Sequence, residues 1–192
     1  MFRCDGLETE ENLEAILDCL SAPACTVSTL LLEPHEYDVD WIGLSKLLLK
    51  VPSITNLTLH HCEELATDAE AQALSELMKA HPSLISFDCR ASSLRGVAAK
   101  TLADAVVQRA TEGRLQTFAD AIPVGELLTD KSIPPGALFK LSPDVNILAD
   151  DDEPCFSIVE AHVLAACLQA SQRILRVGVQ SQRLAGDRKS VV

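Results

Sequence analysis

Three histidines and two cysteines between positions 60 and 89 are the residues of this chain best suited to chemistry. His60, His61 and Cys62 are consecutive, and His81 and Cys89 follow them. A zinc site needs three or four such ligands that converge from paired spacings. The sequence contains no Cys-x-x-Cys pair, and both cysteines fit better as small buried residues that serve the core. We therefore expect neither a metal site nor a cofactor.

A second candidate is the acidic run Asp150–Glu153, whose oxygens could attract a divalent cation. The run lacks the glycine turn and the ligand spacing of an EF-hand, so we interpret it as a solvated loop. The sequence also lacks the GxSxG, P-loop, HExxH and GxGxxG motifs. The chain is therefore predicted not to be an enzyme and to have no small-molecule substrate. The end of the sequence, Ser190-Val191-Val192, matches peptides that add a strand to PDZ domains, a pattern short enough to arise by chance.

Composition narrows the class of partner. The 192 residues include 16 Lys and Arg against 28 Asp and Glu, which gives a net charge of −12. Nucleic acids and anionic membranes attract cationic proteins, so we expect instead a protein partner with a basic patch. No apolar run is long enough to cross a membrane. Seven scattered cysteines and an acidic start without a signal peptide predict reduced thiols and a cytoplasmic location.

The elements that must position these residues follow a repeat of about thirty residues. Six segments each begin with an apolar residue and have another three positions later. They begin at Val27, Ile54, Leu84, Leu115, Val145 and Ile174. This LxxLxL pattern resembles the leucine-rich repeat of the ribonuclease-inhibitor type, and the resemblance spans residues 27 to 179. It implies an α/β solenoid shaped like a horseshoe, with about six parallel strands on the concave face and helices on the convex face.

Amphipathic helices separate the segments. After the second segment, Leu74, Leu77 and Met78 form an apolar stripe, and Asp68 is positioned to cap the helix. The apolar spacing before the first segment predicts a capping helix within residues 1–24, so that the repeats occupy residues 25–192. The fourth unit is irregular over residues 121–142, because Pro134 and Pro135 interrupt its helix. We expect a short turn over residues 125–129 there, followed by a second helix that starts within residues 135–141.

A narrower resemblance concerns the joint between one helix and the next strand. The run from Asp68 through Leu74, Leu77 and Met78 to Leu84 is similar to that joint in the repeats of the tropomodulin family. The stretch AACLQASQRILRVGV is similar to that family's last helix and closing strand. The family's repeat domain caps actin filaments, so the resemblance implies cytoskeletal or axonemal scaffolding and a location at the cytoskeleton or a cilium.

Side chains alternate along a strand, so the same pattern assigns each residue to the core or to the concave face. Leu57, Leu59, Phe87, Cys89 and Leu148 are predicted to be buried. The residues expected to face a partner are Asn56, Thr58, His60, Ser86, Asp88, Arg90, Thr117, Ala119, Ile147, Ala149, Asp151 and Arg176. We interpret the chain as a non-catalytic interaction or scaffold subunit of a larger intracellular assembly. The alternative is a regulator of an enzyme, of the GTPase-activating or inhibitor type, and a plain solvated sheet without a partner also fits the pattern.

Overall fold

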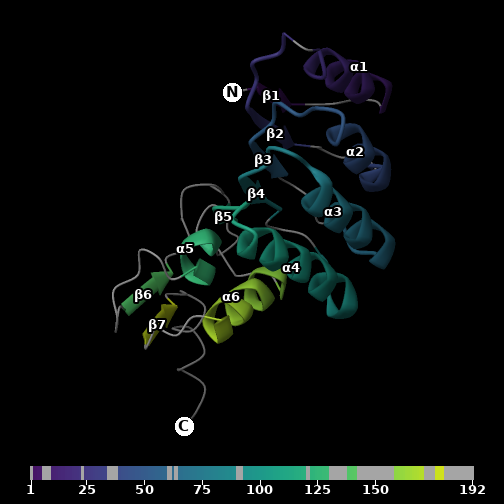
Figure 1. Cartoon of the computed structure of the whole chain (residues 1–192). Helices are drawn as coiled ribbons and strands as arrows, with labels where there is room; N and C mark the ends of the chain where they lie inside the picture. Colours follow the sequence, from purple (N-terminus) through teal and green to yellow (C-terminus); the bar gives the residue numbers. More distant parts are fainter. Residues whose placement is uncertain are drawn as a thin grey trace.

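Figure 1 shows the computed structural model of the chain, an α/β structure in which strands alternate with helices. It describes residues 2–5, 10–22, 24–33, 39–59, 62, 65–89, 93–119, 122–129, 138–141, 158–170 and 176–179. Among these residues, no helix is long and apolar enough to span a membrane.

The main sheet has five parallel strands in the order in which they occur along the chain. These strands are β1 (Phe2–Asp5), β2 (Thr29–Glu33), β3 (Asn56–Leu59), β4 (Ser86–Asp88) and β5 (Thr117–Phe118). The register aligns the first apolar position of each strand with that of the next, from Leu30 to Leu57 to Phe87 to Phe118. Strands β2 to β5 each start at the third residue of a predicted apolar segment, so the repeat pattern located them correctly.

Four helices cover one face of this sheet, and the three figures of the whole chain show them on the same side of the strands. They are α1 (Glu10–Leu20), α2 (Trp41–Leu48), α3 (Asp68–Ala80) and α4 (Gly96–Thr111). The apolar stripes of α3 and α4 face the strands. Their residues Leu74, Leu77, Leu102 and Val106 are fully buried there. Each helix therefore shields the segment of sheet that precedes it in the chain.

The core lies between the sheet and these helices. Leu57, Leu59, Phe87 and Cys89 are at most 2% exposed, as the alternation of the repeat predicted. The rings of Phe87 and Phe118 stack across neighbouring strands with their centroids 6.2 Å apart. Leu148, the fifth predicted core residue, lies outside the described residues.

The N-terminal unit differs from the expected single capping helix. Helix α1 does occupy that end of the stack, but β1 precedes it and pairs in parallel with β2 from Phe2 opposite Leu30 to Asp5 opposite Glu33. The first unit is thus a strand followed by a helix, like the units after it. The prediction missed β1 because the sequence before Phe2 is too short to show the LxxLxL pattern.

The sheet ends abruptly at β5. Ala119 has a positive φ of 51°, and the chain then turns back so that Phe118 and Ile122 form an antiparallel bridge. The short helix α5 (Val124–Thr129) follows, where the sequence predicted a turn. It packs so closely on the start of β5 that a Cβ on Gly125 would lie 3.0 Å from the Leu115 carbonyl oxygen. Helix α6 (Ile158–Ala170) packs against α4 and α5 beyond this point.

A second sheet corrects the expectation of one continuous sheet. Strand β7 (Arg176–Val179), predicted as the sixth repeat strand, pairs in parallel with β6 (Leu138–Leu141) and not with the main sheet. The helix expected to start within residues 135–141 is therefore wrong. All four residues of β6 instead pair with β7, whose two valines favour a strand. The fifth predicted strand, near Val145, lies outside the described residues.

Candidate functional site

The face of the main sheet opposite α1 to α4, here called the open face, carries a row of small polar side chains. The register places Thr29, Asn56, Ser86 and Thr117 side by side on four successive strands. The Asn56 side-chain amide donates to the Thr29 hydroxyl at 3.2 Å, and the Thr117 hydroxyl donates to the Ser86 hydroxyl at 2.7 Å. All four side chains are half-buried. Hydrogen bonds between its own side chains hold this polar row in place, and its amide and hydroxyl groups still face outward.

The next row of side chains on the open face differs from the prediction at β4, where the predicted contact residue is buried. Leu31, Thr58 and Asp88 are in register, and Thr58 is half-buried as expected. Asp88, however, is 1% exposed, so its predicted role as an exposed partner contact is wrong. The prediction took exposure from strand alternation alone, and alternation does not determine how far a side chain is buried by packing.

Ala119 was also expected on the open face, and the structure contradicts this. It is fully buried and occupies the turn after β5, where the positive φ takes it out of the strand geometry. Two-residue alternation cannot be extrapolated past Phe118, the last residue of β5. Of the twelve predicted contact residues, the structure therefore brings together Asn56, Thr58, Ser86 and Thr117.

The remaining predicted contacts cannot be placed on this face. His60, Arg90, Ile147, Ala149 and Asp151 lie outside the described residues, as do His61 and the acidic run at 150–153. Arg176 belongs to β7 in the second sheet, so it does not extend the open face of the main sheet.

Cys62 and Cys89 have the structural role that the sequence predicted. The Cys62 thiol is buried and lies 3.6 Å from the Leu59 carbonyl and 3.5 Å from the Cys89 carbonyl, to which it donates. It thus satisfies the backbone of two neighbouring units where the chain leaves the sheet. Burial raises the pKa of the Cys89 thiol well above its ordinary value, and the nearby Cys62, Asp88 and Glu160 add to this rise. A thiol held protonated in this way is a poor nucleophile and a poor metal ligand.

Carboxylates mark the edge of the stack where the helices begin. Asp40 caps α2 by accepting from the backbone nitrogens of Ile42 and Gly43 at 3.1 and 2.9 Å. Thr67, not Asp68 as predicted, caps α3, and Glu70 completes a capping box with it. Burial and the nearby Asp40 act to raise the pKa of Glu70, but hydrogen bonds from Thr67 and Ala66 outweigh them, so the pKa is lowered. The Glu70 carboxylate therefore stays ionised at neutral pH.

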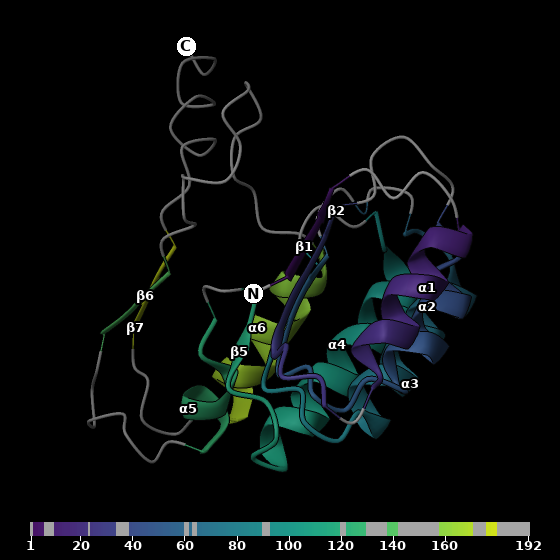
Figure 2. The same cartoon turned by 90° about the horizontal axis from the view of Figure 1, so that it is seen from above.

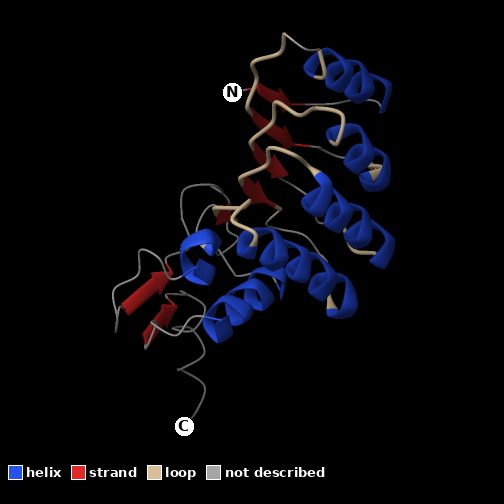
Figure 3. Ribbon diagram, viewed as in Figure 1, coloured by secondary structure: helices blue, strands red, loops and turns tan. Residues whose placement is uncertain are grey.

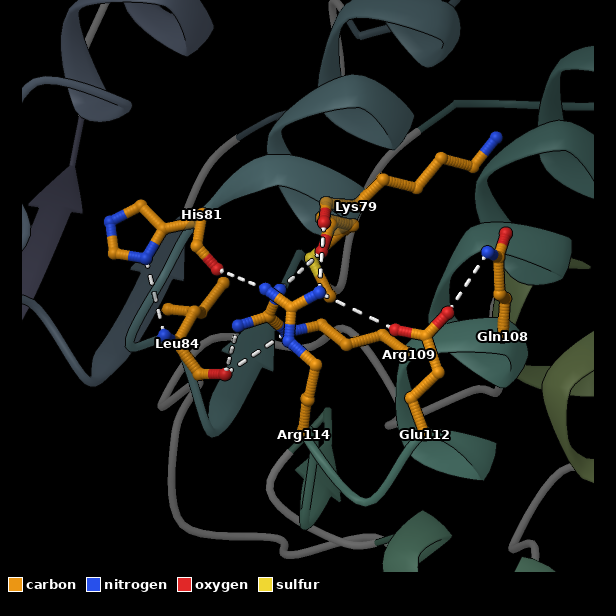
Figure 4. A network of polar contacts seen from close by, with 8 residues as sticks. Lys79, His81, Leu84, Gln108, Arg109, Glu112 and Arg114 are labelled. Carbon is orange, nitrogen blue, oxygen red and sulfur yellow. Dashed lines mark hydrogen bonds and ion pairs between the residues drawn. The ribbon is translucent and has the colours of Figure 1, made fainter.

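The opposite edge, where α3 ends and the chain enters β4, contains a cationic network that the sequence analysis missed (Figure 4). Arg109 of α4 is buried and donates to the carbonyl oxygens of Met78 and Leu84. Arg114 donates to the carbonyl oxygens of Lys79 and His81 at 3.1 and 2.9 Å. Burial, together with the neighbouring Arg114, lowers the pKa of Arg109 to about 10. Two guanidinium groups thus neutralise the negative end of the α3 dipole.

His81 is part of the same joint, and its hydrogen bonds fix which ring nitrogen carries the proton. Its Nδ1 accepts from the backbone nitrogens of Ser83 and Leu84 at 3.3 and 3.2 Å, and its Nε2 lies 3.2 Å from the Val51 carbonyl oxygen. The Nδ1 atom must therefore be unprotonated and Nε2 must carry the proton. Burial lowers the pKa of His81, and the charges of Arg109 and Arg114 lower it further.

The signal that could have revealed this network is a charged residue at a core-facing position of a helix. Leu102 and Val106 belong to the buried stripe of α4, and Arg109 continues that stripe one turn later. An arginine in such a position needs several acceptors, and the carbonyls of Met78 near the end of α3 and of Leu84 before β4 supply them.

The described residues contain no cluster of histidine, cysteine and carboxylate groups that could hold a metal ion. A shallow groove of about 230 Å³ separates α2 from α3 on the helix side and includes Ile42, Lys46, Ala73 and Glu76 in its lining. This volume is below the range of about 300–1,000 Å³ that is typical of small-molecule sites. The open face, with polar groups in register across four strands, is therefore the candidate site that we consider further.

Comparison of the chain with models of protein families finds no match, and a search of curated proteins finds no significant similarity.

Proposed function

We propose that this chain is a leucine-rich repeat solenoid of the ribonuclease-inhibitor type that works as a non-catalytic interaction or scaffold subunit. The polar row of Thr29, Asn56, Ser86 and Thr117 carries this proposal. It crosses four parallel strands in unbroken register and lies on the face that α1 to α4 leave uncovered. Repeat proteins with this construction bury each unit against its neighbours and use the extended face for binding.

The chemistry of the described polar groups also favours binding over catalysis. The hydroxyls of Ser86 and Thr117 bond to each other, and both ring nitrogens of His81 contact backbone groups. A serine or threonine nucleophile would need a base within hydrogen-bond reach to accept its proton. Amide and hydroxyl groups in a row suit a polypeptide, because its backbone offers donors and acceptors at regular spacing.

The partner we propose is a protein with a basic surface. The chain has a net charge of −12, and Asp40 and Glu70 add carboxylates where α2 and α3 begin. Such a charge would speed the approach of a cationic partner, while the polar row would set the orientation of the complex. The resemblance to tropomodulin repeats makes a cytoskeletal or axonemal assembly the setting that we propose.

Thr58→Arg tests the proposal. Thr58 is half-buried on the open face, so a long charged side chain there would obstruct a closely packed partner without entering the core. We expect partners that co-purify with the tagged wild-type chain, quantified by mass spectrometry, to be lost with this variant. Its melting temperature should remain that of the wild type.

Gln72→Arg is the matched control, since Gln72 is exposed on α3 on the other side of the sheet. It introduces the same charge and side chain and should leave the co-purified partners unchanged. Retention of the partners by Thr58→Arg would exclude the open face as the interface, and their loss with Gln72→Arg would place the interface on the helices; either result would contradict the proposal. Turnover of a substrate by the isolated chain would contradict its non-catalytic character.

A further inference from the structure

The two edge strands of the main sheet differ in the hydrogen bonding of their outer backbone groups. At β5 the edge is closed, because Phe118 donates to the Ile122 carbonyl at 2.9 Å and Ile122 donates to the Phe118 carbonyl at 3.0 Å. Helix α5 then donates from Gly125 to the Gln116 carbonyl at 3.1 Å. The chain thus uses its own backbone to satisfy the last strand.

At β1 no described strand lies on the outer side. All four residues of β1 pair with β2, so the strand is regular and fully formed on its inner side. Alternate backbone N–H and C=O groups of a regular strand point to its outer side, where they can pair with another chain. Its sequence, FRCD, contains no proline, so every residue of β1 keeps its backbone N–H donor. The β1 edge is therefore able to accept a further strand.

Helix α1, at the same end of the stack as β1, is rich in negative charge. Helix α1, EENLEAILDCL, contains four carboxylates and no lysine or arginine. Leu17 and Leu20 are buried and Asp18 is exposed. Figure 1 shows α1 and β1 together at the N-terminal end, with α2 on the inner side of α1. A strand that joined β1 would extend the sheet past this acidic helix.

We propose that the β1 edge is a docking site for a lysine- or arginine-rich segment of a partner protein, which adds to the main sheet as a strand. Backbone hydrogen bonds to residues 2–5 hold the segment, and its cations interact with the carboxylates of α1. A second copy of this chain fits less well, because edge-to-edge pairing would bring two acidic α1 helices together. This inference rests on the proposed interaction role and adds a second contact surface to it.

The test uses a synthetic octapeptide of alternating lysine and valine with blocked ends. Fluorescence polarisation measures its affinity for the full chain, and hydrogen exchange measures the protection of the amides of residues 2–5. We expect binding that slows exchange in β1 and leaves exchange in β3 unchanged. The same peptide N-methylated throughout keeps its charge but has no backbone donors, and it should bind about tenfold more weakly or worse.

Charge is tested with two triple variants that each remove three carboxylates. Glu10→Gln/Glu11→Gln/Asp18→Asn removes three of the four carboxylates of α1 and should weaken binding of the peptide at least threefold at low salt. Glu76→Gln/Asp104→Asn/Glu112→Gln makes the same change on α3, on α4 and at the residue that follows α4, and it should leave the affinity for the peptide unaltered. Equal weakening by both variants would show attraction to net charge alone and overturn the proposal.

Other outcomes that overturn it are equal affinity of the N-methylated peptide and protection confined to residues outside β1. Protection of β1 that rises with protein concentration and without peptide would identify a second copy as the occupant. The proposed function can fail independently of this inference. If Thr58→Arg keeps its natural partners while the peptide still protects β1, the open face is excluded as the binding surface and the β1 edge remains a docking site.

Discussion

Arg109 on α4 donates two hydrogen bonds to the carbonyl oxygen of Leu84, at 3.0 Å from Nε and 2.6 Å from one terminal nitrogen. The other terminal nitrogen donates to Met78 at 2.6 Å. One buried side chain thus ties the end of α3 and the entry to β4 to the following helix (Figure 4). Neighbouring units are joined by polar contacts as well as by apolar packing.

Arg109→Met should therefore destabilise the chain strongly. Methionine fills much of the same volume, but it leaves the carbonyls of Met78 and Leu84 buried without these donors. We expect a loss of about 2–4 kcal/mol in the free energy of unfolding, measured by urea denaturation. Arg95→Met is the control, because Arg95 is exposed and makes no side-chain capping bond at α4. A similar loss in both variants would mean that Arg109 contributes no more than an exposed arginine.

His81 predicts a pH dependence of stability in the weakly acidic range. Its folded pKa lies below the ordinary value of 6.5, so the unfolded chain binds the proton more readily. Stability from this group is complete above about pH 6.5 and decreases as the pH falls toward the folded pKa, with a slope of at most about 1.4 kcal/mol per pH unit. Urea denaturation of the wild type at pH 7.5 and 5.5 measures the decrease.

His81→Leu should be less stable than the wild type at pH 7.5, because it leaves the amides of Ser83 and Leu84 without their acceptor. Its stability should nevertheless change less between pH 7.5 and 5.5. An equally steep change in this variant would assign the pH dependence to other groups.

The repeat pattern predicted the units from β2 to β5 because each obeys the same spacing and buries the same positions. Cys62 and Phe87 illustrate this success, since the register alone placed one at a turn and the other in the core. The pattern failed where long-range packing decides the outcome. Ala119 loses its exposure because the chain turns back after Phe118, and the spacing of apolar residues contains no information about that turn.

The capping of α3 shows a local limit of the same kind. Asp68 and Thr67 are adjacent and both belong to residue types that cap helices, so composition alone cannot choose between them. The Thr67–Glu70 spacing, which is that of a capping box, was the decisive signal.

Thr67→Ala should accordingly destabilise the chain by about 1 kcal/mol, because it removes an acceptor for the Glu70 amide and a donor to its carboxylate. Asp68→Ala should cost less, about 0.3–0.5 kcal/mol, since Asp68 interacts with the helix dipole without capping. Thermal or urea unfolding of the two variants compares them directly. The reverse order of effects would restore Asp68 as the cap.

Phe87→Ala tests the apolar contact between units. Phe87 is fully buried and its ring faces that of Phe118, so truncation leaves a cavity that the rigid sheet cannot close. We expect a loss of about 3–5 kcal/mol. Ile85→Ala serves as the control, because Ile85 is 37% exposed and lies two residues earlier. An unchanged melting temperature for Phe87→Ala would contradict the burial of this ring.

Cysteine reactivity gives a final test, which needs no substitution. Cys19 is exposed, whereas Cys62, Cys89 and Cys167 are buried. Burial also raises the pKa of Cys167 to about 12 and that of Cys89 well above its ordinary value, so few of these thiols ionise at neutral pH. Iodoacetamide at pH 8 should modify Cys19 in the folded chain within minutes and leave the three buried cysteines intact until urea unfolds it. Mass spectrometry of tryptic peptides identifies the sites. Modification of Cys62 or Cys89 at the rate of Cys19 would show that the joint between β3 and β4 opens in the native state.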